Sequence, residues 1–579
     1  MEMVKLTIDG IQVEVPKGTT VLEAARAANI QIPTLCYLKG VNEIGACRMC
    51  LVEVKGARNL QASCVYPAAD GMEVKTNTVS IRKARRVNLE LILSNHDRKC
   101  LTCVRSENCE LQALSKQLGV DDIRYDGERI DYAVDDFSTS IVRDPNKCIL
   151  CRRCVATCRD VQGIGAIGAT ERGFRSIVEP AFDKSISDVN CINCGQCIEA
   201  CPVGALREKD DTDRVWEALS NPDLHVVVQT APAVRVALGE EFGMPIGTRV
   251  TGKMVAALRR LGFDRVFDTD FAADLTIMEE GTELLNRLQS GGKLPLITSC
   301  SPGWIKYCEH NYPEFLDNLS TCKSPHEMMG AVVKSYYAEK NNMDPANIFV
   351  VSIMPCTAKK FEAARPELSS TGHPDVDVVL TTRELARMIK QAGIDFIKLN
   401  DEDFDPTLGD STGAAVIFGT TGGVMEAALR TVYEIVTGKT LENLEIHAVR
   451  GMDGVKEVEV PLGDVTIKAA VAHGTANAKA LLEKVKSGEK EYHFIEVMGC
   501  PGGCVTGGGQ PIVPAQVQME IDVHKARAAA IYDEDRALPV RKSHENESVK
   551  KVYAEYLGEP NSHKAHELLH THYTPRKRY

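Results

Sequence analysis

From about residue 210 onward, short runs of β-branched and other apolar residues alternate with longer amphipathic segments. The runs at 226–229, 377–380 and 415–418 predict strands, and the segments that follow them predict helices. The second of these helices begins at a Thr381-Thr382-Arg-Glu cap. Alternation of this kind is typical of an α/β domain, so we expect a mixed or parallel sheet.

Three further predicted strands run directly into loops that carry cysteine. The strands are predicted at 294–298, 347–353 and 493–497, and the thiols belong to Cys300, Cys356, Cys500 and Cys504. Folds of this class usually bind ligands at the carboxyl ends of their strands. We therefore expect the loops to build one iron–sulfur site.

The first 78 residues have a different pattern. Alternating apolar positions at 4–8 and 11–15 predict two strands, and the segment 20–28 predicts a helix capped by Thr19 or Thr20. A first cysteine, a close Cys-x-x-Cys and a distant fourth cysteine follow, at Cys36, Cys47, Cys50 and Cys64. This arrangement predicts a β-grasp domain with a 2Fe-2S cluster. A four-cysteine zinc site is the alternative, but such sites normally use two close pairs.

Residues 79–138 open with a basic helical segment at 80–93. A histidine and three cysteines come next, at His96, Cys100, Cys103 and Cys109. Three thiolates and one imidazole can complete a 4Fe-4S cluster, and the neutral ligand should raise its potential. A lone histidine more often has a structural role, but its position before a Cys-x-x-Cys favours ligation.

Residues 139–209 contain two consecutive C-x2-C-x2-C-x3-C runs, which are typical of two-cluster ferredoxins. In that motif the fourth cysteine of each run ligates the other cluster. The predicted sets are Cys148, Cys151, Cys154 with Cys201, and Cys191, Cys194, Cys197 with Cys158. The first run has Arg159 where a proline usually follows.

Composition narrows the function further. A formal charge of -12 argues against nucleic acid or an anionic membrane as the main partner. No apolar run approaches the ~18 residues of a spanning helix, and the N-terminus predicts a strand and no export signal. The 21 cysteines therefore indicate metal binding in the cytoplasm and not disulfides. Glycine-rich turns at 419–423 and 502–509 fit no nucleotide motif, so we expect close backbone approach to a buried cofactor.

With these motifs together, the chain resembles the iron-only (FeFe) hydrogenases over essentially its whole length. The loops at 298–304, 354–362 and 496–504 carry the resemblance, and the first 209 residues also resemble domains of complex I and hydrogenase subunits. The resemblance implies an α/β H-cluster domain at 210–579, preceded by three α+β iron–sulfur domains. The H-cluster is a 4Fe-4S cubane bridged by cysteine to a two-iron subsite that carries CO, cyanide and an azadithiolate.

The resemblance also assigns residues to the H-cluster. Cys356, Cys500 and Cys504 would hold the cubane, with Cys504 as the bridge, and Lys359 would hydrogen-bond a cyanide. The remaining cofactor-binding residues would be Met354, Met498, Phe418, Ala231 and Pro232. Without the cysteines nearby, these would be ordinary core residues. His326 and Ala233 stand where other members carry different polar residues.

The first loop departs from the family pattern of two adjacent cysteines, because this chain has Cys300 followed by Ser301. In the family the first cysteine carries protons and the second ligates the cubane. Thiolate is the better iron ligand. We therefore expect Cys300 to ligate the cubane after a local shift, leaving Ser301 as a hydroxyl relay.

A proton route is also implied by the resemblance. The helix predicted at 278–287 carries Glu280, Glu283 and Arg287 on one face, and together with Ser320 they match the family's route. A charged helix face is more often simply solvated. Cys308 and Cys322 have no assigned role and are expected to be buried structural thiols.

The predicted reaction is the reversible reduction of protons to hydrogen. Accessory clusters imply an external electron partner, either ferredoxin or flavin- and NAD(P)-binding and small iron–sulfur subunits. The C-terminal segment 565–579 and the Cys300-Ser301 pair resemble subunits of electron-bifurcating complexes. An electron-transfer subunit like those of complex I would lack the three loops. A hydrogen sensor or a cluster-assembly relative would keep the cubane without fast turnover.

Overall fold

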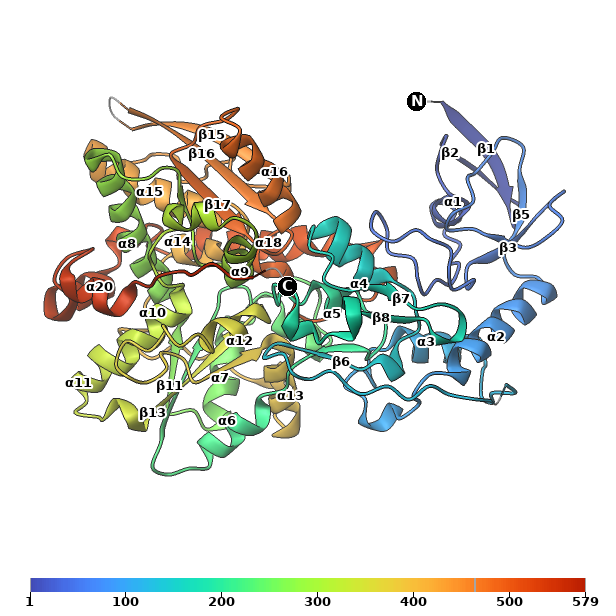
Figure 1. Ribbon diagram of the computed structural model, residues 1–579, viewed down its shortest axis with the longest axis horizontal. Helices are drawn as coiled ribbons and strands as arrows, with labels where there is room; N and C mark the ends of the chain where they lie inside the picture. Colours follow the sequence, from blue (N-terminus) through green and yellow to red (C-terminus); the bar gives the residue numbers. More distant parts are fainter. Residues whose placement is uncertain (1, 126, 463–464, 578–579) are drawn as a thin grey trace.

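The computed structural model describes residues 2–125, 127–462 and 465–577. The β-grasp domain lies at one end and the large α/β domain at the other, with the cysteine-rich segments between them (Figure 1). No helix within the described residues is long and apolar enough to cross a membrane.

The N-terminal domain is a five-stranded sheet in the order β2-β1-β5-β3-β4. Its elements are β1 (Met3–Ile8), β2 (Ile11–Pro16), α1 (Val21–Ala27), β3 (Leu51–Val54), β4 (Gln61–Ala62) and β5 (Glu73–Lys75). Strand β1 pairs antiparallel with β2 and parallel with β5. The Thr20 side chain accepts a hydrogen bond from the Glu23 amide, so Thr20 is the N-cap, as predicted.

The middle of the chain is built from short elements around the cysteines. They are α2 (Val79–Ser94), α3 (Glu110–Gln117), β6 (Ile141–Arg143), α4 (Arg153–Ala156), β7 (Gly168–Thr170), β8 (Ile177–Glu179), α5 (Gln196–Ala200) and β9 (Leu206–Glu208). Strands β6 and β9 pair antiparallel, as do β7 and β8. Buried cysteines make up much of the small core here.

The large domain contains two four-stranded sheets, where the sequence suggested one. The first sheet, ordered β11-β10-β13-β14, is fully parallel. The second, ordered β12-β17-β16-β15, has only its edge strand β15 antiparallel. The strands are β10 (His225–Thr230), β11 (Arg265–Asp268), β12 (Leu296–Ile297), β13 (Ile348–Met354), β14 (Val378–Thr381), β15 (Val455–Leu462), β16 (Val465–His473) and β17 (Phe494–Met498).

Helices pack between and around these sheets. Helix α8 (Thr269–Ser290) contacts β10, and α15 (Gly423–Thr437) contacts α8, β15 and β17. Helix α13 (Thr382–Gln391) begins with the predicted capping box between Thr381 and Glu384. Helix α8 contributes residues to both hydrophobic cores, Phe271 and Leu275 to that of the first sheet and Ala273 and Ile277 to that of the second, and so joins the two sheets.

Two local predictions were wrong. Residues 415–418 form the end of α14 (Gly413–Val416) and a 3-10 turn, because a short apolar run buried on all sides looks the same as a buried strand. The segment after Ala233 forms turns and a short 3-10 helix. The glycine turns approach other backbone: a Cβ on Gly508 would lie 2.4 Å from Gly195, and one on Gly422 would lie 1.9 Å from the Val449 carbonyl.

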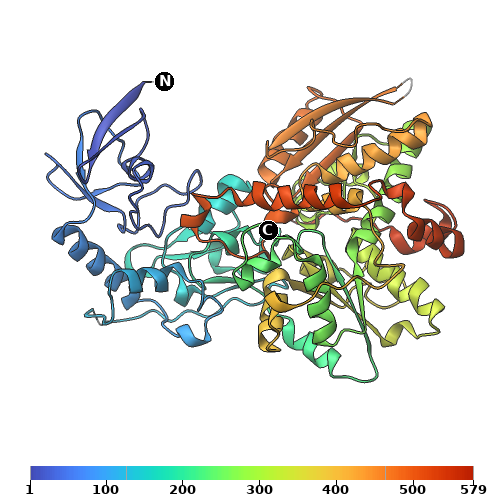
Figure 2. The same ribbon diagram turned by 180° about the vertical axis from the view of Figure 1, so that it is seen from behind.

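The C-terminal region wraps around the large domain. Helix α18 (Val523–Ala537) crosses the back of the molecule (Figure 2), followed by α19 (Glu547–Val552) and α20 (His563–Leu569). The final extended segment is fixed by backbone hydrogen bonds from Thr571 N to Thr321 O, 2.7 Å, and from Arg576 N to Glu309 O, 2.9 Å. The tail therefore packs against residues 309–323.

Candidate metal centres and active site

The four cysteines of the β-grasp domain lie together. The Cys50 and Cys64 sulfurs are 3.2 Å apart, and the Cys36 thiol hydrogen-bonds with Cys47. Hydrogen bonding from Cys47 lowers the pKa of Cys36 to about 6 against the effect of burial. Two thiol pairs held against each other at one end of a sheet fit a 2Fe-2S cluster.

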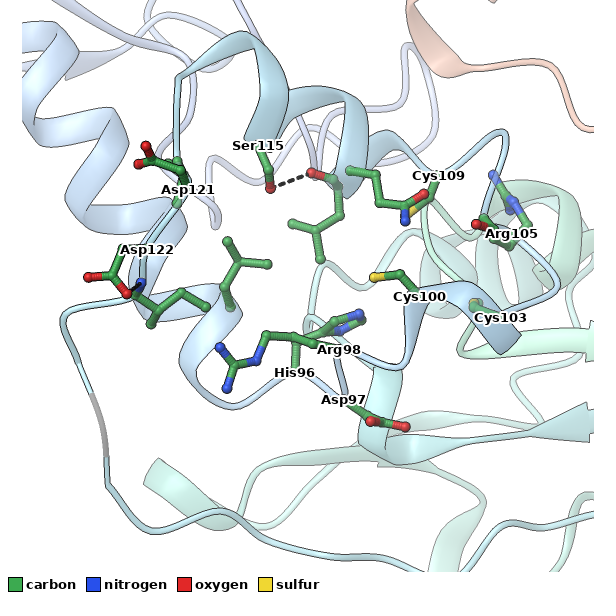
Figure 3. A pocket seen from close by; sticks show the side chains of 17 residues that line it. His96, Asp97, Arg98, Cys100, Cys103, Arg105, Cys109, Ser115, Asp121 and Asp122 are labelled. Carbon is green, nitrogen blue, oxygen red and sulfur yellow. Dashed lines mark hydrogen bonds between the residues drawn. The ribbon is translucent and has the colours of Figure 1, made fainter.

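The predicted ligands of the next site line one cavity of about 360 Å³. Figure 3 shows His96, Cys100, Cys103 and Cys109 around this space. Within the described residues, the buried Nδ1 of His96 has no hydrogen-bond partner, and burial lowers the pKa of this imidazole. An unprotonated imidazole with a free nitrogen, facing three thiols, fits a histidine-ligated 4Fe-4S cluster.

The eight ferredoxin-type cysteines separate into the two predicted sets. Burial raises the pKa of Cys154 strongly, and the neighbouring thiols Cys151, Cys201 and Cys148 add to the effect. Burial likewise raises the pKa of Cys194, where the thiols of Cys191 and Cys158 contribute. Each set therefore combines three cysteines of one run with the fourth of the other.

Hydrogen bonds connect the first three of these sites. Asn42 Nδ2 donates to the carbonyl of Cys36 at 2.7 Å and to that of Cys151 at 3.0 Å. Arg105 Nη1 donates to the Cys201 carbonyl at 2.8 Å. The β-grasp site and the His96 site thus both adjoin the Cys148–Cys201 site.

The second ferredoxin-type site adjoins the large domain. Thr357 Oγ1 donates to the Asn193 carbonyl at 2.7 Å, and the Cys194 thiol lies close enough to Cys356 and Cys500 to interact electrostatically. The thiol sites therefore form a continuous series that ends at the loops after β13 and β17.

Those loops surround a cavity of about 60 Å³ in the large domain. Nine of the predicted residues line it: Ala231, Pro232, Cys300, Met354, Cys356, Lys359, Phe418, Met498 and Cys504. Thr269, Ala273, Pro325, His326 and Pro355 complete the lining. Cys500 lies just outside and hydrogen-bonds with Cys356, which lowers the pKa of Cys356. Cys356 and Cys504 at the cavity, with Cys500 beside them, fit the predicted cubane ligands.

Cys300 and Ser301 point to different neighbours. Burial raises the pKa of the Cys300 thiol, with further contributions from Glu280 and Cys504 and an opposing one from Lys359. Ser301 Oγ accepts a hydrogen bond from the Gly499 amide at 3.0 Å, beside Cys500. Cys300 thus faces the cavity and Glu280, whereas Ser301 faces the Cys500 loop.

Lys359 belongs to α12 (Ala358–Ala363) and is fixed from two sides. Its Nζ donates to the Cys300 carbonyl at 3.1 Å and to Glu362 Oε2 at 2.6 Å. Burial opposes its charge, but the Glu362 carboxylate together with the Cys300 and Cys356 thiols raises the pKa of Lys359. His326 Nε2 donates to the same Glu362 oxygen at 2.7 Å, and burial followed by the Lys359 charge lowers the pKa of His326 to about 4.

Neither Glu362 nor His326 had a definite role in the sequence-based prediction. Glu362 lies three residues after Lys359, which places both on one helix face. This spacing is the feature of the sequence that could have indicated their contact. The contact with His326 joins segments distant in sequence and had no such signal.

The predicted proton-route residues form a connected set. Ser320 Oγ donates to Glu283 Oε2 at 3.0 Å, and Arg287 Nη2 donates to Glu283 Oε1 at 2.5 Å. Burial raises the pKa of Glu280 to about 8, against an opposing hydrogen bond with Ser320. The series runs from Cys300 through Glu280, Ser320 and Glu283 to Arg287.

The two cysteines without an assigned role are both fully buried. Cys308 Sγ donates to the Tyr312 carbonyl at 3.5 Å. Cys322 lies beside the proton-route residues, and its Sγ is 3.9 Å from Glu283 Oε2.

Comparison with known proteins gives family matches along the chain. The model for the C-terminal domain of the iron-only hydrogenase large subunit matches residues 224–508, and that for the iron hydrogenase small subunit matches 521–576. Upstream, a 2Fe-2S iron–sulfur cluster binding domain matches 1–79, an NADH-ubiquinone oxidoreductase-G iron–sulfur binding region matches 85–124, and a 4Fe-4S dicluster domain matches 147–205.

Individual relatives agree. The NADP-reducing hydrogenase subunit HndD of Solidesulfovibrio fructosivorans is 53% identical over 100% of both chains. Iron hydrogenase 1 of Clostridium pasteurianum is 44% identical over 99% of this chain and 100% of its own. A solved structure of a variant of the [FeFe]-hydrogenase HydA1 from Chlamydomonas reinhardtii is 43% identical with a TM-score of 0.57, and covers 64% of this chain and 100% of its own. The predicted fold class is thereby confirmed, and the chain belongs to the iron-only (FeFe) hydrogenases, enzymes that interconvert hydrogen with protons and electrons.

Proposed function

We propose that this chain is the hydrogen-converting subunit of an NAD(P)-linked complex, with an H-cluster and four accessory clusters. The observation that carries the proposal is the continuous series of thiol sites, which ends at a buried cavity bounded by Lys359 and Glu280. The domains would be 1–78 for the 2Fe-2S cluster, 79–138 for the histidine-ligated cluster, 139–209 for two 4Fe-4S clusters and 210–579 for the H-cluster.

The H-cluster, when bound, supplies the metal chemistry that forms or splits the H–H bond. Cys356, Cys500 and Cys504 would hold it. Lys359, kept charged by Glu362, would donate to an anionic ligand in the cavity. Met354, Met498 and Phe418 would pack against the group and exclude water from it.

Two assignments are possible for Cys300 and Ser301. The sequence favours thiolate ligation by Cys300. The contacts favour the reverse, because Cys300 faces Glu280 and the cavity while Ser301 lies beside the Cys500 loop. We propose that Cys300 exchanges protons with Glu280, and that the Ser301 oxygen stands at the fourth cubane position.

Protons would then move between Cys300 and the surface through Glu280, Ser320 and Glu283. Each of these groups can both give and accept a proton or a hydrogen bond. With a pKa of about 8, Glu280 is protonated at neutral pH and can donate inward when hydrogen is produced.

Electrons would enter by either of two branches. One starts at the 2Fe-2S site and the other at the His96 site, and both adjoin the Cys148–Cys201 site through Asn42 and Arg105. The relative named as an NADP-reducing hydrogenase subunit suggests partner subunits that bind flavin and NAD(P), because this chain has no nucleotide motif of its own. We further propose ferredoxin as a carrier, a small iron–sulfur partner subunit and a cytoplasmic location.

Two measurements test the proposal. The matured protein should show infrared bands of bound CO and cyanide and should evolve hydrogen from a reduced dye. If both are missing after maturation, the H-cluster assignment fails. Purification under mild conditions should yield associated flavin-containing subunits, whereas a homogeneous single chain fully active with ferredoxin would contradict the complex.

A further inference from the structure

The proton route ends at Arg287, which cannot itself pass a proton. Its guanidinium donates to Glu283 Oε1 at 2.5 Å and to several backbone carbonyls, those of Lys293, Asp317, Asn318 and Leu319. A guanidinium is a donor that stays charged at any physiological pH. Arg287 can therefore orient Glu283, but another group must exchange the proton with solvent.

The second oxygen of Glu283 contacts a different side chain. Thr321 approaches Glu283 Oε2 with its amide at 3.1 Å and its hydroxyl at 3.4 Å. The same hydroxyl is 2.8 Å from Nδ1 of His570. A hydroxyl donates and accepts at once, and an imidazole can take a proton on one nitrogen and release it from the other.

His570 is held in place by the docked tail. Backbone hydrogen bonds on both sides of it, from Lys323 N to Leu569 O and from Thr571 N to Thr321 O, align the tail with residues 321–323. The His570 side chain is 5% exposed, and its Nε2 lies 3.1 Å from Glu279 Oε2.

The groups around His570 suit a histidine that changes its charge. Glu279, which also accepts from Tyr553 and from the Asn561 amide, can balance an imidazolium. Glu283 and Cys322 face His570 from α8 and from the 320–323 segment. The exposed ring of His566 packs on it with centroids 4.0 Å apart, which brings the pair to the surface.

We propose that Thr321 and His570 form the surface end of the proton route, with His566 at the solvent. Outward, Glu283 gives its proton to Thr321 Oγ1 while Thr321 gives its own to His570 Nδ1. The imidazolium shares its Nε2 proton with the Glu279 carboxylate, 3.1 Å away, and this proton then leaves to solvent on the side of the exposed His566 ring. Inward transfer is the reverse, and no electrons move in either step. This inference rests on the proposed function, because it extends the same route.

The experiment compares variants of the matured holoenzyme. We expect His570→Ala and Thr321→Val to lower hydrogen evolution about tenfold, because the Glu283 side chain is 11% exposed and can still exchange slowly with solvent. Thr321→Ser, which keeps the hydroxyl, should retain most of the activity. Added imidazole should restore His570→Ala but not Thr321→Val. His563→Gln is the control, because His563 is 90% exposed at the start of α20 and pairs with Glu567.

A second readout does not depend on turnover. After a rapid pH jump, the infrared signal of the buried Glu280 carboxyl should follow the solvent more slowly in His570→Ala than in the wild type. If His570→Ala and Thr321→Val both keep the activity and the proton-exchange rate of the wild type, the inference is overturned. In that case the activity of the wild type still supports the proposed function. Loss of activity in His570→Ala without imidazole rescue, together with an active Thr321→Val, would assign His570 a purely structural role. An inactive wild type without CO and cyanide bands would overturn both proposals.

Discussion

Replacement of Glu280 by glutamine is the most direct perturbation of the proposed proton route. The side chain is 2% exposed, and burial raises its pKa to about 8 despite the hydrogen bond with Ser320. Glutamine keeps the size and the hydrogen-bonding capacity of the neutral carboxyl but has no acidic proton that it could pass on. We expect Glu280→Gln to lower hydrogen evolution by about 10²- to 10⁴-fold, the usual contribution of a positioned proton-transfer group.

The same substitution should lower activity but raise the free energy of unfolding at high pH. Between pH 4.5 and about 8 the folded protein binds a proton at Glu280 that the unfolded chain has released, so stability falls as the pH rises through this window. The difference between a pKa of 4.5 and one of about 8 corresponds to roughly 5 kcal/mol at most. Glu280→Gln should therefore be more stable than the wild type at pH 8.5, with little difference near pH 4.5.

Two assays check these expectations. Hydrogen evolution from reduced methyl viologen gives the activity, and infrared bands of CO and cyanide show that the H-cluster is present in the variant. Denaturant midpoints at the two pH values give the stability difference, with Glu339→Gln, at an exposed carboxylate, as the control. Full activity of Glu280→Gln, or an identical stability difference at both pH values, would refute the reasoning.

Four other substitutions have defined outcomes. Cys300→Ala should abolish hydrogen evolution and keep the cubane, whereas Ser301→Ala should reduce the iron bound at this site. Iron analysis and electron paramagnetic resonance measure the cubane content of both variants. The reverse pattern would make Cys300 the ligand. Arg383→Ala removes one of two arginine partners of the buried Glu208, each 2.7 Å away, so the free energy of unfolding should fall by about 1.5–3 kcal/mol, measured by denaturation. His96→Cys should lower the potential of its cluster in a redox titration, because a thiolate replaces a neutral imidazole.

The grouping of the cysteines in space could be predicted from sequence because ligation of a cluster requires both a residue type and a spacing. The four cysteines from Cys36 to Cys64, and the two ferredoxin-type runs, group in space as their spacing implied. The strands that lead to Cys356 and Cys500 were also predictable, since a long β-branched run followed by a turn seldom forms any other secondary structure than a strand.

Elements buried on every side could not be predicted in the same way. Residues 413–419 are almost wholly inaccessible, so their apolar run has no period that separates helix from strand. The division into two sheets depends on which strands pair, and β12 and β17 pair although nearly 200 residues separate them. Such pairing is decided by the packing of α8 and α15 between the sheets, which local patterns do not contain.

The outer end of the proton route shows the same limit in the site itself. Glu280 and Glu283 share a helix face, so their spacing in the sequence predicts that they lie close together. Thr321 meets Glu283 because its segment packs against α8, and His570 joins them only because the tail docks beside residues 321–323; both residues have ordinary neighbours in the sequence. Since the buried half of the route is fixed by local spacing and the surface half by tertiary docking, changes in the tail should alter proton exchange without altering the cluster ligands.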